Sequence, residues 1–263
     1  MHFRDGLRLN IDNFQHVLSD NTHTDTNNLP LIYKYPYLLC GTLIERYKRF
    51  LADIELPDGR TITAHCPNSG SMKTCSEPGM PVWFSESSNP KRRLPYTWEL
   101  IQMNDSLVGV NAIIPNKLIK SAITSSILPE LSGYHEIISE IKTSKNTRLD
   151  LCLKSQDQKH CFIEIKNCTF VENGVASFPD AVTSRGKKHL EELSRLITYR
   201  NRCVILFVVQ RMDADVFAPA DSIDPEYGKA LRKAVSEGVE ILVYDTYMSI
   251  HGIGIRRRIN TLL

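Results

Sequence analysis

One short segment combines two acidic residues and a lysine in a pattern that could carry metal chemistry. The segment "RLDLCLKSQDQKHCFIEIKN" (148–167) has two strand-like stretches around the polar turn "SQDQK". Alternate side chains of a strand point to one face, so Glu164 and Lys166 share a face. If the turn centres on Asp157, Asp150 lies opposite Glu164. The spacing therefore predicts Asp150, Glu164 and Lys166 together on one face of a hairpin, with the apolar Leu149, Leu151 and Leu153 on the other.

Two carboxylates at that separation repel each other unless a cation lies between them. Mg²⁺ or Mn²⁺ suits the site, because hard divalent cations prefer carboxylate oxygens. Lys166 could orient or help deprotonate the attacking water, or stabilise charge on a phosphate. We interpret Asp150 and Glu164 as metal ligands, and the three residues as catalytic residues of phosphodiester hydrolysis.

An ordinary solvated hairpin face is the competing interpretation, because polar residues are common on exposed sheet faces. The Glu-x-Lys triplet also occurs a second time, at Glu140-Ile141-Lys142. No strand with an aspartate precedes that triplet at hairpin distance. Glu140, or Glu136 on a preceding helical turn, could instead add an acidic group to the site.

Three basic clusters could contact nucleic acid. Cations neutralise phosphates and aromatic faces stack on bases. The clusters lie in "NPKRRLPYTWEL", "ERYKRF" and "TSRGKKHLEEL". Their candidate residues are Lys91, Arg92, Arg93, Tyr96 and Trp98; Arg46, Lys48 and Arg49; and Arg185, Lys187, Lys188 and His189. A solvated basic surface is the alternative for each cluster, and for the first cluster this alternative places Trp98 in the core.

Composition limits the classes of partner. The 263 residues are 42% hydrophobic and carry a net charge of only +2, so a polyanion must be held by local patches. Seven scattered cysteines without a CxxC pair argue against a zinc site and indicate reduced thiols in a cytoplasmic protein. No apolar run approaches the ~18 residues of a membrane span, and we expect no membrane segment. The polar stretch before Leu29 indicates a loose extension.

The periodicity of the chain changes near residue 115. Between Tyr37 and Ile114 about five short strands are expected, including one long strand across "LIERYKRFLADIEL" and hairpins at "PDGR" and "NDS". Such a series suggests an OB-like β-barrel. Beyond it, strand-like runs alternate with helical patterns at "TSRGKKHLEELSRLITY" and "DPEYGKALRKAVSEG", and "VEILVYDTYM" is the last expected strand. This alternation predicts an α/β domain with a partly parallel sheet.

The order Asp strand, hairpin, Glu-x-Lys strand and helix resembles the core of PD-(D/E)XK nucleases. Phrases such as "RFLADIELPDG", "AHCPNSGSM", "IEIKNCT" and "FPDAVTSRGKKHL" make the chain similar to the sugar fermentation stimulation protein A family from about Tyr35 to Ile255. Leu149 stands where the motif has proline. The resemblance implies DNA binding and places Asp150, Glu164 and Lys166 at the nuclease motif positions.

We therefore expect an extension (1–34), an OB-like barrel (35–115) and a PD-(D/E)XK nuclease-like mixed sheet flanked by helices (116–263). The expected function is that of a DNA-binding protein with a Mg-dependent nuclease site, and single-stranded nucleic acid is a further possible ligand. The alternative is a non-catalytic DNA-binding regulator of sugar metabolism genes, because nuclease-like folds also serve as binding modules.

Overall fold

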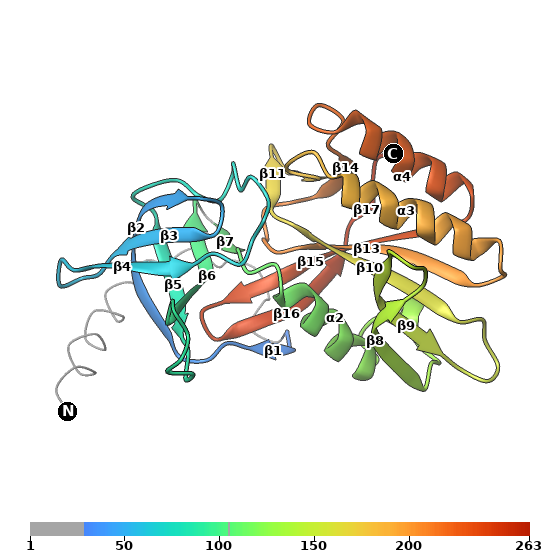
Figure 1. Ribbon diagram of the computed structural model, residues 1–263, viewed down its shortest axis with the longest axis horizontal. Coiled ribbons are helices and arrows are strands. Elements are labelled where there is room, and N and C mark those ends of the chain that lie inside the picture. The colour runs from blue at the N-terminus through green and yellow to red at the C-terminus, as the bar shows by residue number, and fades with distance from the viewer. Residues whose placement is uncertain (1–28, 105) are drawn as a thin grey trace.

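The first half of the molecule is a six-stranded, nearly closed barrel. The computed structural model describes residues 29–104 and 106–263 (Figure 1). The barrel strands are β2 (Leu38–Tyr47), β3 (Leu51–Glu55), β4 (Thr61–His65), β5 (Pro81–Glu86), β6 (Tyr96–Met103) and β7 (Ser106–Gly109). They follow the order β4-β3-β2-β5-β6-β7, and a short parallel pairing of β4 with β6 closes the sheet. The OB-like architecture expected from the sequence is confirmed.

The expected long strand across residues 43–56 is instead a hairpin. Strand β2 ends at Tyr47 and β3 begins at Leu51. Lys48 and Arg49 both have left-handed backbone conformations, with φ of 46° and 67°. Residues other than Gly, Asn and Asp seldom adopt this conformation, so little in the residue types predicted the turn.

Trp98 belongs to the barrel core, which corrects its assignment as a base-stacking residue. Its side chain is 0% exposed and its indole N–H donates to the Leu100 carbonyl oxygen at 2.9 Å. It packs in one apolar cluster with Phe84 and Ile101. A ring enclosed in this way offers no face to a base.

The second half is built on a seven-stranded mixed sheet of order β1-β16-β15-β13-β10-β9-β8. Its strands are β1 (Tyr33–Lys34), β8 (Glu136–Lys142), β9 (Arg148–Lys154), β10 (Cys161–Cys168), β13 (Arg202–Val209), β15 (Glu240–Ser249) and β16 (Gly252–Arg258). β10, β13 and β15 are parallel and central, and the central position of β13 explains its nearly continuous apolar sequence.

Helices cover both faces of this sheet (Figure 1). α2 (Ile114–Thr124) packs on one face, whereas α3 (Ser184–Ile197) and α4 (Pro225–Ser236) pack on the other. Thr183 and Asp224 cap the two latter helices by accepting from the backbone N–H groups of Gly186 and Tyr227. The α/β class with a partly parallel sheet is thus confirmed.

Several elements were not expected from the sequence. Glu136, predicted on a helical turn, begins β8, and the short 3₁₀ helix η2 (Pro129–Leu131) precedes it. β15 is followed by the antiparallel β16 rather than ending the sheet. A small sheet also forms from β11 (Phe170–Glu172), β12 (Val175–Phe178), β14 (Val216–Pro219) and β17 (Asn260–Thr261).

Buried polar groups join the barrel to the mixed sheet. The Gly109 N–H donates to the Gln210 carbonyl oxygen at 2.8 Å, and the Gln210 side-chain amide donates to Asn167 at 2.8 Å. Gly109 permits this approach, because a Cβ there would lie 2.6 Å from the Gln210 side-chain oxygen. Asp180 accepts from the Met72 N–H at 2.9 Å. The barrel is therefore fixed against the end of β10.

The expectation of unpaired thiols holds, since all seven cysteines are free and buried. No helix within residues 29–104 and 106–263 is long and apolar enough to cross a membrane. The loose extension predicted before Leu29 lies outside the described residues.

Replacing Trp98 by alanine should lower the free energy of unfolding by about 3–5 kcal/mol, because it empties a fully enclosed indole site. Denaturant unfolding measures this, with Tyr37→Ala as a control at a side chain that is 59% exposed. Wild-type tryptophan fluorescence should also stay constant when an oligonucleotide is added. A large fluorescence change together with a near-neutral Trp98→Ala would contradict the core position.

Candidate active site

The β9–β10 hairpin has the register predicted from its turn. Cys161 pairs with Leu153 and Ile163 with Leu151, so the next position in that register places Asp150 against Glu164. The regular pairing ends at Leu151, and the Asp150 carboxylate then accepts the backbone N–H of Ile165 at 2.7 Å. The Asp150 side chain thereby accepts a hydrogen bond from a backbone N–H of β10 beyond the end of the regular β9–β10 pairing.

This change at Asp150 breaks the expected alternation of leucines. Leu151 and Leu153 pack on the α2 side of the sheet, whereas Leu149 packs on the α3 and α4 side. The prediction that all three leucines share one face was wrong. Its physical reason is that β9 separates from β10 at Asp150, so strict period-two alternation does not continue past Leu151.

Asn116 is a second partner of Asp150 that sequence reasoning missed. It lies in the first turns of α2 and its side-chain amide donates to the other Asp150 carboxylate oxygen at 2.7 Å. With the Ile165 N–H, this bond holds both oxygens of the carboxylate. The only sequence signal was the position of Asn116 at the start of a helical pattern.

The Asp150 carboxylate is costly to ionise. Burial raises its pKa, the negative charge of Glu164 raises it further, and the two accepted hydrogen bonds lower it only in part, leaving a pKa of about 6 against an ordinary 3.8. The negative charge of Glu164 thus disfavours ionisation of Asp150, in the direction expected for two nearby carboxylates.

Glu164 is more deeply buried but has the opposite shift. Its side chain is 3% exposed. Burial alone would raise its pKa, yet the hydrogen bond from His189 and the charge of Lys166 hold it below the ordinary value. Lys166 Nζ donates to Oε1 at 2.5 Å, and His189 Nδ1 donates to the same oxygen.

The second oxygen of this carboxylate, Oε2, is buried and accepts no hydrogen bond from any described residue. Buried carboxylate oxygens are normally hydrogen-bonded, so an unpartnered one calls for an explanation. The Glu164 carboxylate thus has one oxygen with two donors and one oxygen without a donor among the described residues.

His189 was predicted as an exposed nucleic-acid contact, and this assignment is corrected. It lies on the inward face of α3 with Leu190 and Leu193, and it is 5% exposed. Arg185 Nε donates to its Nε2 at 3.4 Å, which leaves the ring proton on Nδ1 to be donated to Glu164. Helical spacing alone could have placed it inward, beside the leucines.

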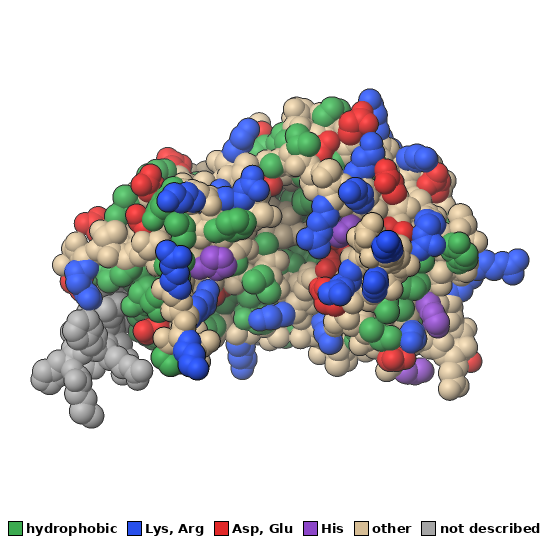
Figure 2. All heavy atoms as spheres, in the orientation of Figure 1, with side chains coloured by type: hydrophobic (Ala, Val, Ile, Leu, Met, Phe, Trp, Pro, Cys, Tyr) green, Lys and Arg blue, Asp and Glu red, His purple; other side chains and the backbone are tan. Residues whose placement is uncertain are grey.

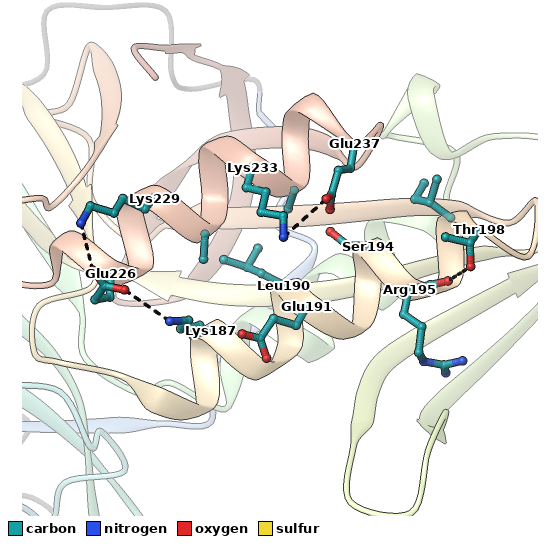
Figure 3. A pocket seen from close by; sticks show the side chains of 13 residues that line it. Lys187, Leu190, Glu191, Ser194, Arg195, Thr198, Glu226, Lys229, Lys233 and Glu237 are labelled. Carbon is teal, nitrogen blue, oxygen red and sulfur yellow. Dashed lines mark hydrogen bonds and ion pairs between the residues drawn. The ribbon is translucent and has the colours of Figure 1, made fainter.

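The remaining α3 cations divide between the site and the surface. Arg185 is exposed and adjoins the site through His189, and Lys188 is exposed. Lys187 pairs with Glu226 at 3.4 Å and lines a groove of about 770 Å³ between α3 and α4 (Figure 3). Lys229 also pairs with Glu226, at 3.0 Å. Much of the charge along this groove is therefore paired within the protein.

The other predicted basic residues lie on the barrel. Arg46 is turned inward and donates to the carbonyl oxygens of Asn68, Gly70 and Ser71, so it organises that loop and is not a free cation. Lys48 and Arg49 are exposed at the β2–β3 turn.

The loop between β5 and β6 presents a further group of cations. Lys91 and Arg93 are exposed, and Arg92 lies 3.4 Å from the His65 ring. Tyr96 is half-buried and packs edge-on against Phe84. Figure 2 shows this side of the molecule hollowed between its two halves, with Lys and Arg side chains on both sides of the hollow.

The two extra acidic candidates do not join the site. Glu136 and Glu140 lie on the edge strand β8, where both are exposed. Their ion pairs are with Lys154 at 3.7 Å and Arg148 at 3.6 Å. The second Glu-x-Lys triplet is therefore part of a solvated strand.

The resulting geometry defines an OB-like barrel joined to a mixed α/β sheet that holds two interacting carboxylates, a lysine and a histidine. Residues 44–110 match the family model described as the SfsA N-terminal OB domain, and residues 113–252 match the Sugar fermentation stimulation protein RE domain. The chain belongs to this family of sugar fermentation stimulation proteins.

Its relatives cover most of its length. It is 49% identical over 223 residues to the sugar fermentation stimulation protein homolog of Geotalea uraniireducens, covering 85% of this chain and 96% of the relative. The corresponding homolog of Geobacter sulfurreducens is 50% identical over 225 residues, covering 86% and 96%. The structure of Pyrococcus furiosus SfsA in complex with Ca²⁺ is similar in fold, with a TM-score of 0.82 at 22% identity, covering 89% of this chain and all of the other.

In the absence of divalent cations, replacing Asp150 by asparagine should stabilise the protein in a pH-dependent way. The amide resembles the protonated acid, so the two proteins should be equally stable near pH 4. The pKa of Asp150 is raised in the folded wild-type protein, so its free energy of unfolding falls as pH rises from about 4 through 6. The asparagine variant escapes this loss, which amounts to about 3 kcal/mol. Unfolding in chelator at pH 4 and pH 8 checks this, with Asp157→Asn in the exposed hairpin turn as control. If the difference in free energy of unfolding between the two proteins is the same at pH 4 and pH 8, a buried ionised Asp150 is not its cause.

Proposed function

We propose that this protein is a divalent-cation-dependent nuclease of the PD-(D/E)XK type that acts on DNA. The observation that carries the proposal is the buried Oε2 of Glu164, which has no hydrogen-bond partner among the described residues and whose carboxylate adjoins the ionisable Asp150 and the amine of Lys166. We further propose a boundary between the barrel and the nuclease-like domain at residue 115. The free, buried thiols support a cytoplasmic location.

The donor set fits Mg²⁺ or Mn²⁺. Both candidate ligands are carboxylates, and their mutual repulsion favours a cation. No group of three or more His, Cys, Asp or Glu side chains suited to a metal occurs among the described residues, so water and substrate oxygens would complete the coordination. The Ca²⁺ complex of the Pyrococcus furiosus protein supports an oxygen-rich site of this kind.

The roles of the side chains follow from their contacts. A bound cation would stabilise the charge that develops on a phosphodiester and would activate a water molecule. Asn116 and the Ile165 N–H fix the orientation of the Asp150 carboxylate. Lys166 holds its ammonium group beside Glu164, from where it can donate to a phosphate oxygen or orient the attacking water. Arg185 extends positive charge toward the surface.

Nucleic acid would be held mainly by electrostatics. Lys91, Arg92 and Arg93 lie on the barrel side, Arg185 contacts His189 of the site, and Lys188 is exposed on α3. The hollow in Figure 2 joins these two halves of the molecule. Because phosphate contacts are independent of sequence, this surface supports binding without a base-reading element.

A non-catalytic DNA-binding regulator is the alternative. Burying Glu164, Lys166 and His189 together costs desolvation energy, and a protein that only binds has no need of such a group. In the other Glu-x-Lys triplet, Glu140 is exposed and pairs with Arg148, and Lys142 is exposed, so that triplet avoids the cost. The buried site therefore favours the enzyme.

Replacing Lys166 by alanine should reduce cleavage of DNA at least about 100-fold while Mn²⁺ binding persists, because a proton-transfer or charge-stabilising group is lost without a ligand. Asp150→Asn should abolish both. Lys142→Ala is the matched control from the exposed triplet and should cleave like the wild type. A purified wild-type protein that binds DNA but neither binds Mn²⁺ nor cleaves would leave the regulator as the better description.

Affinity for duplex DNA should fall with salt, with a slope in log K against log[salt] of about 0.9 for each phosphate contact. Changing Lys91, Arg92 and Arg93 to alanine should flatten the slope by about that amount for each contact removed. Lys229→Ala with Lys233→Ala, on the α4 surface, controls for the removal of positive charge at another place on the molecule. If the barrel-loop variant and the α4 variant change the salt slope equally, the DNA-binding surface lies elsewhere.

A further inference from the structure

Two donors compete for one oxygen of Glu164. Lys166 Nζ and His189 Nδ1 both donate to Oε1 and lie 3.2 Å from each other. Since Arg185 donates to the other ring nitrogen, the nitrogen facing Lys166 carries a proton. An ammonium group and an N–H cannot bond each other, so only the shared oxygen holds them together.

The two donors differ in freedom. Lys166 has a long, flexible side chain that is 11% exposed, whereas the His189 ring is stiff, 6% exposed and held by Arg185. If Lys166 serves a phosphate, as the proposed function requires, it must leave Oε1 during the reaction. The His189 N–H is then the remaining donor to that oxygen.

We propose that His189 is a positioning residue that holds the Glu164 carboxylate in place when Lys166 turns to the substrate. By retaining Oε1 on the α3 side, it keeps Oε2 as the oxygen available to the cation. This inference rests on the proposed function. It adds that the histidine acts through Glu164 and does not itself touch the reacting phosphate.

The N–H at this position, rather than the size of the ring, is the decisive feature. His189→Asn places an amide donor near the position of Nδ1, whereas His189→Leu has a similar volume and no donor. His135, exposed just before β8, supplies His135→Asn as a control for the same substitution elsewhere. Partners that orient metal ligands typically contribute 10–100-fold in metal affinity.

The experiment is Mn²⁺ titration calorimetry on the full-length protein, with thermal melts and DNA cleavage measured on the same samples. His189→Leu should weaken Mn²⁺ binding about 10–100-fold and reduce kcat. His189→Asn should remain within a few-fold of the wild type, and His135→Asn should be unchanged. A merely structural role predicts a lower melting temperature with unchanged Mn²⁺ affinity, and that result would overturn the inference.

The outcomes also separate the two proposals. A wild type that neither binds Mn²⁺ nor cleaves defeats the proposed function, and the role of His189 with it. A wild type that binds and cleaves, together with a folded His189→Leu of equal Mn²⁺ affinity, defeats only the positioning role. If His189→Leu does not fold, His189→Gln replaces it, because its amide extends past the Nδ1 position. Weaker Mn²⁺ binding by His189→Gln but not by His189→Asn supports the positioning role. Equal Mn²⁺ affinity of the two variants overturns it.

Discussion

The buried carboxylate of Glu164 is the interaction on which the rest of the site depends. A charge that is 3% exposed is tolerated only when it is paired and hydrogen-bonded. Lys166, two residues along the same strand, supplies the counter-charge, and His189 supplies a second donor from α3. Both act on Oε1, so the compensation that makes burial possible also leaves Oε2 without a donor among the described residues.

The surrounding fold is arranged to hold that carboxylate still. β10 lies inside the sheet between β9 and β13, with α2 on one face and α3 on the other. The barrel adds a constraint at the end of β10, where Gln210 joins Asn167 to the barrel strand β7 through Gly109. The OB-like barrel thus supports the strand that carries Glu164 and Lys166, in addition to presenting the cations of the β5–β6 loop.

The sequence predicted the parts of this arrangement that are local. Turn polarity was sufficient for the hairpin register, and apolar periodicity with capping residues was sufficient for α3 and α4. It failed where tertiary contacts decide: Asn116 reaches Asp150 across 34 positions, and His189 reaches Glu164 across 25. Trp98 was misassigned because a barrel strand carries core and surface residues alternately, and neighbouring basic residues do not reveal which face is inside.

The two carboxylates of the hairpin show how such distant partners give similar residues different properties. Asp150 and Glu164 lie on the adjacent strands β9 and β10, yet the pKa of Asp150 is raised to about 6 and that of Glu164 is lowered. Asp150 receives only neutral donors, from Asn116 and a backbone N–H, whereas Glu164 receives an ammonium group. The protein therefore compensates the charge of Glu164 by direct contact, whereas the charge of Asp150 is only partly compensated, by neutral donors and by Lys166. Environments that separate the pKa values of paired groups in this way are typical of sites that perform chemistry.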